Sequence, residues 1–173
     1  AQALGANLFD NEKKEIKRGS IGLKNLKSIN LTNLDHRIKN CEFLVACDVN
    51  NPLYGINGAT FTFGPQKGFD EKDLYEFDKY MKNYGDLIDM NSGYKISNVP
   101  GSGAAGGLGA GFMFFLKGKL QSGSQIILDY INFESQGKNA DIIITGEGQI
   151  DFQTINNKAP IALARIAKKH NIP

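Results

Sequence analysis

The chain has 173 residues, enough to bury one sizeable hydrophobic core, so we expect one domain or one domain with an added lobe. Hydrophobic residues make up 41% and charged residues 22%, which is ordinary for a soluble globular protein. The formal net charge of +2 is too small to favour nucleic acid or an anionic membrane as a partner, and no apolar run is long enough for a transmembrane helix.

The first forty residues predict only short elements. Residues 7–20 are polar and lysine-rich, as in a loop or a short hairpin. Residues 22–34 carry apolar side chains that are first three apart and then alternate, which indicates a helical turn followed by a short strand.

Residues 41–49 form the next predicted strand, and it is apolar almost throughout, so we expect burial on both faces. Cys41 and Cys47 fall on the same side of it, where a disulfide within one extended strand is geometrically poor. We therefore expect reduced core thiols in a cytoplasmic protein. Asp48 ends the strand, and the common interpretation of such an aspartate is a capping Asx-turn.

Residues 55–68 are expected to form a long loop plugged by aromatic side chains, with Lys67 as a solvated lysine rather than a phosphate contact. Residues 70–90 are the clearest helix. Asp70 is a natural N-cap, and Asp73 takes the place of the capping-box acid. Apolar residues three and four positions apart, among them Tyr84, form one stripe along this helix, and we expect that stripe only to pack against the core.

Residues 99–116 contain a match to GxGxxG that begins at Gly101. The preceding segment is a poor strand, so we reject a dinucleotide-binding site of the Rossmann type. What remains is a glycine-rich helix start, with one helical face that lacks side chains. Tight packing of that face and anion binding by its free backbone N–H groups both remain open.

The last part of the chain predicts a helix over residues 125–137, a strand over residues 141–148 and a helix from Pro160. Two acids and a lysine follow the carboxyl end of that buried strand: Glu147, Asp151 and Lys158. Such groups could hold a metal ion and a phosphoryl oxygen. The sequence contains no zinc-ligand spacing, nucleophile elbow or P-loop.

Three motifs then point to a family. ACDVNNPLYGINGATFTFGPQKG (46–68), PGSGAAGGLGAG (100–111) and ITGEGQIDFQTINNKAP (144–160) together resemble the bacterial glycerate kinases, in the right order and over essentially the whole chain. The proteins of that family are longer, so we expect this chain to be an internal fragment of the enzyme.

The resemblance implies that ATP phosphorylates glycerate to phosphoglycerate with Mg²⁺, in a cleft between two α/β lobes. Residues 1–138 would be most of an inserted lobe, incomplete at its N-terminus, and residues 139–173 a strand and helix of the Rossmann-like lobe. The fragment alone would be inactive. The alternatives are a non-catalytic substrate- or nucleotide-binding lobe, a kinase for another small hydroxy acid, or a nucleotide- or sugar-phosphate-binding transferase.

Site residues follow from the resemblance as a hypothesis. Asp48 and Asn50 would line one wall of the cleft. The backbone donors for a phosphate or for the glycerate carboxylate would be four glycines: Gly101, Gly103, Gly106 and Gly107.

The catalytic groups would be Asp151, Glu147 and Lys158. Glu147 and Asp151 would hold Mg²⁺ or accept the hydroxyl proton of the substrate, and Lys158 would neutralise phosphoryl charge. We expect Asp151 to matter most, and we expect its segment to meet Asp48 and Gly103 across one pocket.

Overall fold

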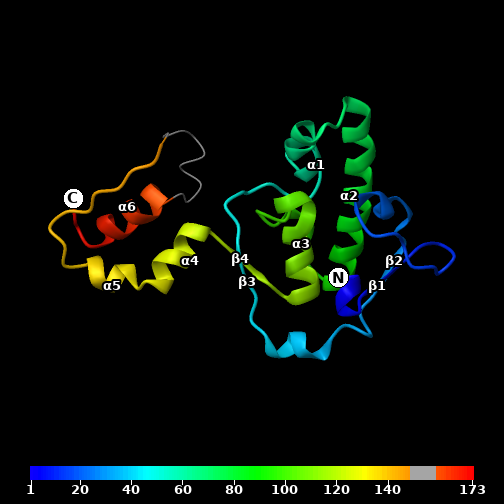
Figure 1. The fold of residues 1–173 in the computed structure, drawn as a ribbon, viewed down its shortest axis with the longest axis horizontal. Helices are drawn as coiled ribbons and strands as arrows, with labels where there is room; N and C mark the ends of the chain where they lie inside the picture. Colours follow the sequence, from blue (N-terminus) through cyan, green and yellow to red (C-terminus); the bar gives the residue numbers. More distant parts are fainter. Residues whose placement is uncertain (149–158) are drawn as a thin grey trace. The chain divides into compact units, whose positions relative to one another are not determined.

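The computed structural model describes residues 1–148 and 159–173, which form a mixed α/β structure in two units (Figure 1). The first unit comprises residues 1–44 and 49–119, and the second comprises residues 45–48 and 120–173. The helices and strands, with 3₁₀ helices marked η, are η1 (Gln2–Leu4), β1 (Asn7–Phe9), η2 (Ser20–Asn25), β2 (Ser28–Asn30), η3 (His36–Asn40), β3 (Leu44–Ala46), α1 (Ala59–Phe63), η4 (Pro65–Lys67), α2 (Glu71–Ser92), η5 (Ile96–Asn98), α3 (Ala104–Leu116), β4 (Lys119–Gln121), α4 (Gly123–Tyr130), α5 (Phe133–Gly137) and α6 (Ala159–Lys169).

Helix α2 confirms the capping prediction. The Asp70 carboxylate accepts the Asp73 N–H at 2.8 Å, and the Asp73 carboxylate accepts the Asp70 N–H at 3.4 Å. The helix continues through Gly85 to Ser92, close to the predicted end at residue 90. A Cβ at Gly85 would lie 2.8 Å from the Tyr54 ring, so the glycine makes room for that ring against the helix.

The core of the first unit forms around α2, which packs against η2, η5, β2, α1 and α3 (Figure 1). Strands β1 and β2 pair antiparallel, with Leu8 opposite Ile29. Helix η2 and strand β2 confirm the helical turn and the short strand that were predicted within residues 22–34. The buried apolar side chains of this unit include Leu8, Leu26, Ile29, Leu53, Met81, Tyr84, Ile88, Ile96, Met113, Phe114 and Phe115.

The segment predicted as a fully buried strand is shorter and more exposed than expected. Only Leu44–Ala46 form β3, and Leu44 is 50% exposed. Among the described residues its sheet partner is β4, and a two-stranded sheet cannot bury both faces. The two cysteines form no disulfide, as expected, but Cys41 is exposed and Cys47 is half-buried, so neither lies in the core.

Residues 55–68 also differ from the expected loop, because they contain α1 and η4. An aromatic contact does form there. The Phe61 ring meets the Tyr75 ring edge-on, with the ring centroids 5.2 Å apart.

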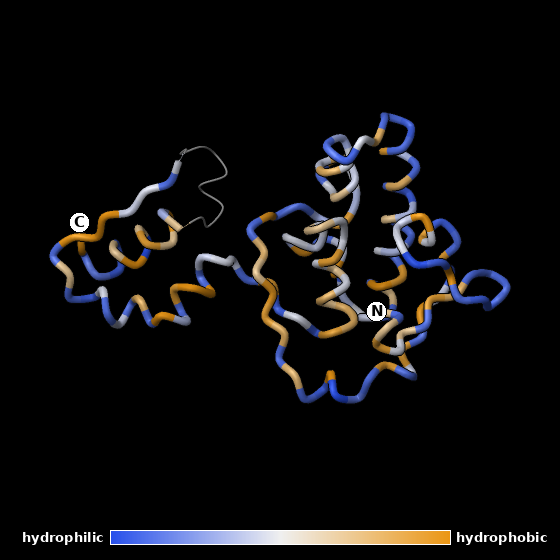
Figure 2. Tube along the Cα trace, in the orientation of Figure 1, coloured by the Kyte–Doolittle hydropathy of each residue, from blue (hydrophilic) through white to orange (hydrophobic). Residues whose placement is uncertain are grey.

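In the second unit, the helix expected over 125–137 is divided into α4 and α5 at Asn132, whose φ is +52°. The strand expected over 141–148 is absent from the described residues of this segment. Figure 2 shows the segment after α5 as hydrophobic, yet Ile144 is 86% exposed. No strand among the described residues pairs with it, so nothing there orders it into a sheet.

Helix α6 is held to α5 by charge. Glu134 accepts from Lys169 Nζ at 2.6 Å and pairs with His170 Nε2 at 2.8 Å, and both contacts lower the pKa of Glu134. His170 therefore connects two helices. Throughout residues 1–148 and 159–173, no helix is both long and apolar enough to cross a membrane.

Candidate functional site

The glycine turn, which we define as residues 101–107, is the most unusual backbone of the first unit. Ala105, Gly106 and Gly107 have φ values of 50°, 72° and 92°, so three consecutive residues inside the assigned α3 are left-handed. A left-handed alanine costs roughly 1–2 kcal/mol, and such strain persists only where the surrounding structure enforces it. The expected helical face without side chains therefore does not form, because the helix is not regular there.

Close packing accounts for two glycines of the turn and one that follows it. A Cβ at Gly103 would overlap the carbonyl oxygen of Pro52, and a Cβ at Gly109 would overlap the carbonyl oxygen of Gly101. A Cβ at Gly107 would lie 2.5 Å from Met81 Cε. Tight packing, one of the two interpretations left open, is therefore correct at these positions.

Gly106 is different, because its side-chain position is open and exposed. The nearest heavy atom to a Cβ there is Lys67 Nζ, at 4.0 Å. Among the described residues, neither the Ala105 N–H nor the Gly106 N–H has a hydrogen-bond acceptor, and Lys67 has no carboxylate partner. Unpaired N–H groups beside an ammonium group suit an anion, so this part of the turn fits a phosphate group.

A buried polar chain holds the start of the turn. Asp89, which is 7% exposed, accepts the Ser97 N–H at 2.9 Å and the Ser97 hydroxyl at 2.6 Å. The Ser97 carbonyl in turn accepts the Ser102 hydroxyl at 2.9 Å, and Ser102 is fully buried. These contacts fix the backbone that enters the turn. No periodic pattern in the sequence predicts them, because Asp89 lies on α2, Ser97 on η5 and Ser102 in the turn before α3.

Asn51 rather than Asn50 supports the turn. The Gly103 N–H donates to the Asn51 carbonyl at 3.0 Å, while Asn51 Nδ2 donates to Asn57 O at 2.8 Å and Thr62 Oγ1 at 3.0 Å. Asn50 is exposed. Asn51 was not among the predicted site residues; the signal that could have found it is its place directly before Pro52, where the chain must turn and amide side chains commonly bond to nearby backbone.

Asp48 belongs to the second unit, where it holds the start of α4. Its Oδ1 accepts the Gly123 N–H at 2.8 Å, and Gly123 is the first residue of that helix. A carboxylate is favourable there because the first N–H groups of a helix lack partners within the helix. Asp48 therefore acts as a capping group, as the common interpretation held, but for a distant helix rather than for its own turn.

Two of the three expected catalytic residues, Asp151 and Lys158, lie outside the described residues. Glu147 is described, on the segment that follows α5. Within residues 1–148 and 159–173, no three His, Cys, Asp or Glu side chains gather so that they could hold a metal ion. A magnesium site at Glu147 and Asp151 therefore stays a prediction, as does the meeting of Asp48, Gly103 and Asp151 across one pocket.

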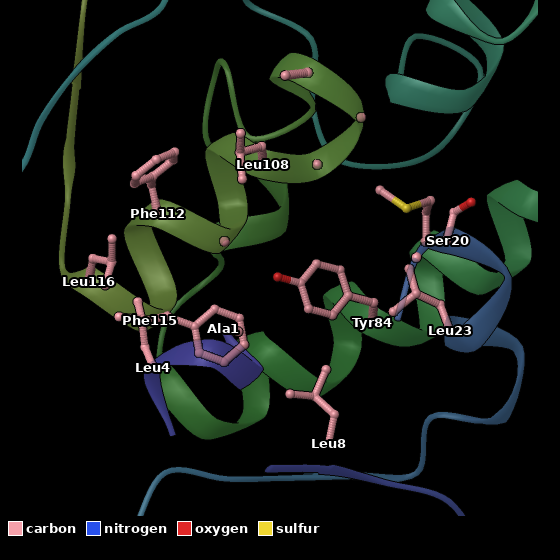
Figure 3. Close-up of a pocket in the computed structure, with 16 residues that line it drawn as sticks. Ala1, Leu4, Leu8, Ser20, Leu23, Tyr84, Leu108, Phe112, Phe115 and Leu116 are labelled. Atoms are coloured by element: carbon pink, nitrogen blue, oxygen red, sulfur yellow. The ribbon is translucent and has the colours of Figure 1, made fainter. Parts of the chain in front are cut away.

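An apolar cavity of about 520 Å³ adjoins the glycine turn within the first unit. Residues 105–108 form one wall, together with Phe112 and Phe115 of α3, and Tyr84 enters from α2 (Figure 3). Tyr84 is 8% exposed, its hydroxyl points toward α3, and burial raises its pKa. In the part of the chain that the structure describes, that hydroxyl has no hydrogen-bond partner. The sequence had assigned Tyr84 to packing alone.

The model of the glycerate kinase family matches residues 1–173. The chain belongs to the glycerate kinase family. It is 45% identical to glycerate 2-kinase of Escherichia coli K12 over 172 residues, which are 99% of this chain and 45% of that protein. It is 42% identical to glycerate kinase of Halalkalibacterium halodurans over 173 residues, which are 100% of this chain and 46% of that protein.

A solved structure shows the same fold. A crystal structure from Salmonella typhimurium LT2 that carries the name glycerate kinase 2 matches with a TM-score of 0.85 and 44% identity, over 99% of this chain and 46% of that one. The chain thus spans about half the length of the relatives that it matches.

Proposed function

We propose that the protein containing this chain transfers the γ-phosphoryl group of ATP to glycerate, giving phosphoglycerate. The observation that carries this proposal is the match of the glycerate kinase family model to all 173 residues. The three motifs that suggested the family are spread between residues 46 and 160, so the similarity is not confined to one common structural segment.

The glycine turn supplies the phosphate contacts. The N–H groups of Ala105 and Gly106 have no acceptor among the described residues and can therefore donate to a phosphate. Lys67 adds a positive charge beside them. Close packing at Gly103 and Gly107 holds the left-handed backbone, so little ordering is needed when a phosphate binds. Gly101, Gly103 and Gly107 shape this turn, and Gly106 leaves it open.

The chemistry itself is assigned to the later segment. Asp151 accepts the proton of the glycerate hydroxyl as that oxygen attacks the γ-phosphorus, the bond from the γ-phosphorus to the β–γ bridging oxygen breaks, and ADP leaves. Lys158 stabilises the charge on the transferred group. Glu147 and Asp151 would hold Mg²⁺, which when bound neutralises charge on the phosphate oxygens. Asp48 and Asn50 form the opposite wall of the cleft.

The architecture that suits this reaction has two lobes with the cleft between them. Residues 1–138 form most of one lobe, and residues 139–173 contribute helix α6 to the other, in a cytoplasmic enzyme. Because the chain spans about half of its relatives, the remaining half is needed to complete the cleft, and this chain alone does not turn over substrate.

The test uses the full-length protein in a coupled assay of ADP formation, with glycerate compared against other small hydroxy acids. We expect glycerate to be the preferred acceptor. Asp151→Asn keeps the side-chain shape and removes the charge, so kcat should fall about 100-fold or more. Asp141→Asn, at an exposed carboxylate ten positions earlier, is the matched control and should leave kcat unchanged.

Two results would count against the proposal. If the wild-type protein phosphorylates another hydroxy acid and not glycerate, the substrate assignment is wrong. If Asp151→Asn retains the kcat of its control, Asp151 has no part in the reaction.

A further inference from the structure

The unpaired hydroxyl of Tyr84 is the feature of the cavity that packing does not explain. Among the described residues no fully buried side-chain oxygen lacks a hydrogen-bond partner, so the Tyr84 hydroxyl is reached through the cavity that it lines, and a phenylalanine would fill the same space without offering a polar atom to that cavity. Burial is the sole cause of its raised pKa, which agrees with the absence of a partner among the described residues. A polar group aimed into an otherwise apolar cavity is how ligand pockets fix the orientation of what they bind.

The cavity also has the size and walls of a ligand site. About 520 Å³ lies within the usual range of 300–1,000 Å³ for small-molecule pockets. Leu108 and Phe112 on α3 and Leu23 on η2 give it apolar sides (Figure 3). Such walls exclude a free phosphate or a small hydroxy acid, and they suit a planar heteroaromatic ring with polar atoms at its edge.

The cavity is continuous with the proposed phosphate site. Ala105 and Gly106, whose N–H groups have no acceptor among the described residues, also line the cavity. One ligand with a flat apolar end and an anionic end would therefore meet both features without crossing any intervening element.

We propose that this cavity binds the adenine base of the nucleotide whose phosphates contact the glycine turn, with the Tyr84 hydroxyl hydrogen-bonded to the edge of the base. This inference rests on the proposed function, because it takes ATP as the ligand. The inference adds the position of the base and a residue that hydrogen-bonds to it, Tyr84.

Two variants of the full-length protein test the assignment. Leu108→Trp places a larger side chain in the cavity at a position that is 55% exposed, so the fold can accept it. Its control is Met90→Trp, on α2, 73% exposed and outside the cavity lining. Tyr84→Phe removes only the hydroxyl, and Tyr75→Phe on the same helix is its control.

Leu108→Trp should raise KM for ATP about 10-fold or more, equivalent to about 1.4 kcal/mol, with KM for glycerate unchanged. Tyr84→Phe should raise KM for ATP about 3- to 10-fold, the loss of one hydrogen bond, without lowering Tm. The controls should match the wild type. Calorimetric titration of ATP should show the same order of affinities.

The proposal is overturned if KM and Kd for ATP stay at control values in Tyr84→Phe, whether or not Leu108→Trp folds. That result would make the cavity a packing surface for the rest of the protein. It would leave the proposed function intact as long as the wild type still phosphorylates glycerate. Conversely, loss of ATP affinity in both variants of a protein that does not accept glycerate would support the base site and reject the substrate.

Discussion

Helix α2 and the glycine turn show two ways in which this sequence determines structure. Each signal for α2 is local: Asp70 and Asp73 cap its start, and apolar residues recur every three or four positions. The glycine turn has an equally distinctive sequence, yet its backbone is decided by distant groups. Pro52 lies where a Cβ of Gly103 would be, and Met81 lies where a Cβ of Gly107 would be.

The difference teaches that composition identifies a special backbone but does not give its conformation. The sequence does not distinguish a glycine at a helix start from one in a left-handed turn or one packed against a carbonyl group of another segment. Helix α2 therefore contributes to the stability of the fold through many small interactions. The turn contributes through a few close contacts that leave no room for an added atom.

The largest effect that separates the two regions should come from Gly103→Ala. The added methyl group would overlap the Pro52 carbonyl oxygen at a buried position, where neither backbone can move freely. We expect a loss of at least about 3 kcal/mol in the free energy of unfolding, measured by urea denaturation of the full-length protein.

Gly106→Ala is the matched control, because its side-chain position is open and only its positive φ is strained. It should cost about 1 kcal/mol. Equal losses in the two variants would show that packing against Pro52 does not set the turn.

On the α2 side, Asp70→Ala should have an intermediate effect. It removes the acceptor for the Asp73 N–H and half of the capping box, so the free energy of unfolding should fall by about 1 kcal/mol. Asp86→Ala breaks only an exposed ion pair with Lys82 and should cost less than about 0.5 kcal/mol. If both substitutions cost the same, the cap is not what defines the start of this helix.

The smallest effect should appear at Asp35, another local cap. Hydrogen bonds from the Arg37 side chain and backbone lower the Asp35 pKa to about 2 in the folded protein, against about 3.9 in an unfolded chain. A lowered folded pKa stabilises the fold above the unfolded value, and this contribution is lost as the pH falls from about 4 to 2.

The measurement is the difference in Tm between the wild type and Asp35→Asn as a function of pH. That difference should be small and constant above about pH 5 and should shrink toward pH 2. A difference that does not change with pH would mean that the charge of Asp35 contributes nothing.

The sequence predicted what depends on neighbours along the chain. It identified the cap and extent of α2 within a few residues and the short strand β2, while a phosphate site at the glycine segment stays a prediction. It failed where burial depends on distant segments: residues 41–49 and 142–144 are apolar, but their described neighbours do not cover them. Asn51 and the hydroxyl of Tyr84 were missed for the same reason, since their surroundings come from other elements.

Lys67 offers the most direct test of the central claim, that the glycine turn holds the phosphates of ATP. The measurement is KM for ATP and for glycerate in full-length Lys67→Ala, beside Lys79→Ala, which removes an exposed lysine from α2. We predict that Lys67→Ala raises KM for ATP at least about 10-fold, with KM for glycerate unchanged, because a charge-assisted contact is worth about 1.5–3 kcal/mol. If Lys67→Ala has the same KM for ATP as Lys79→Ala, the phosphates bind elsewhere and the account is contradicted.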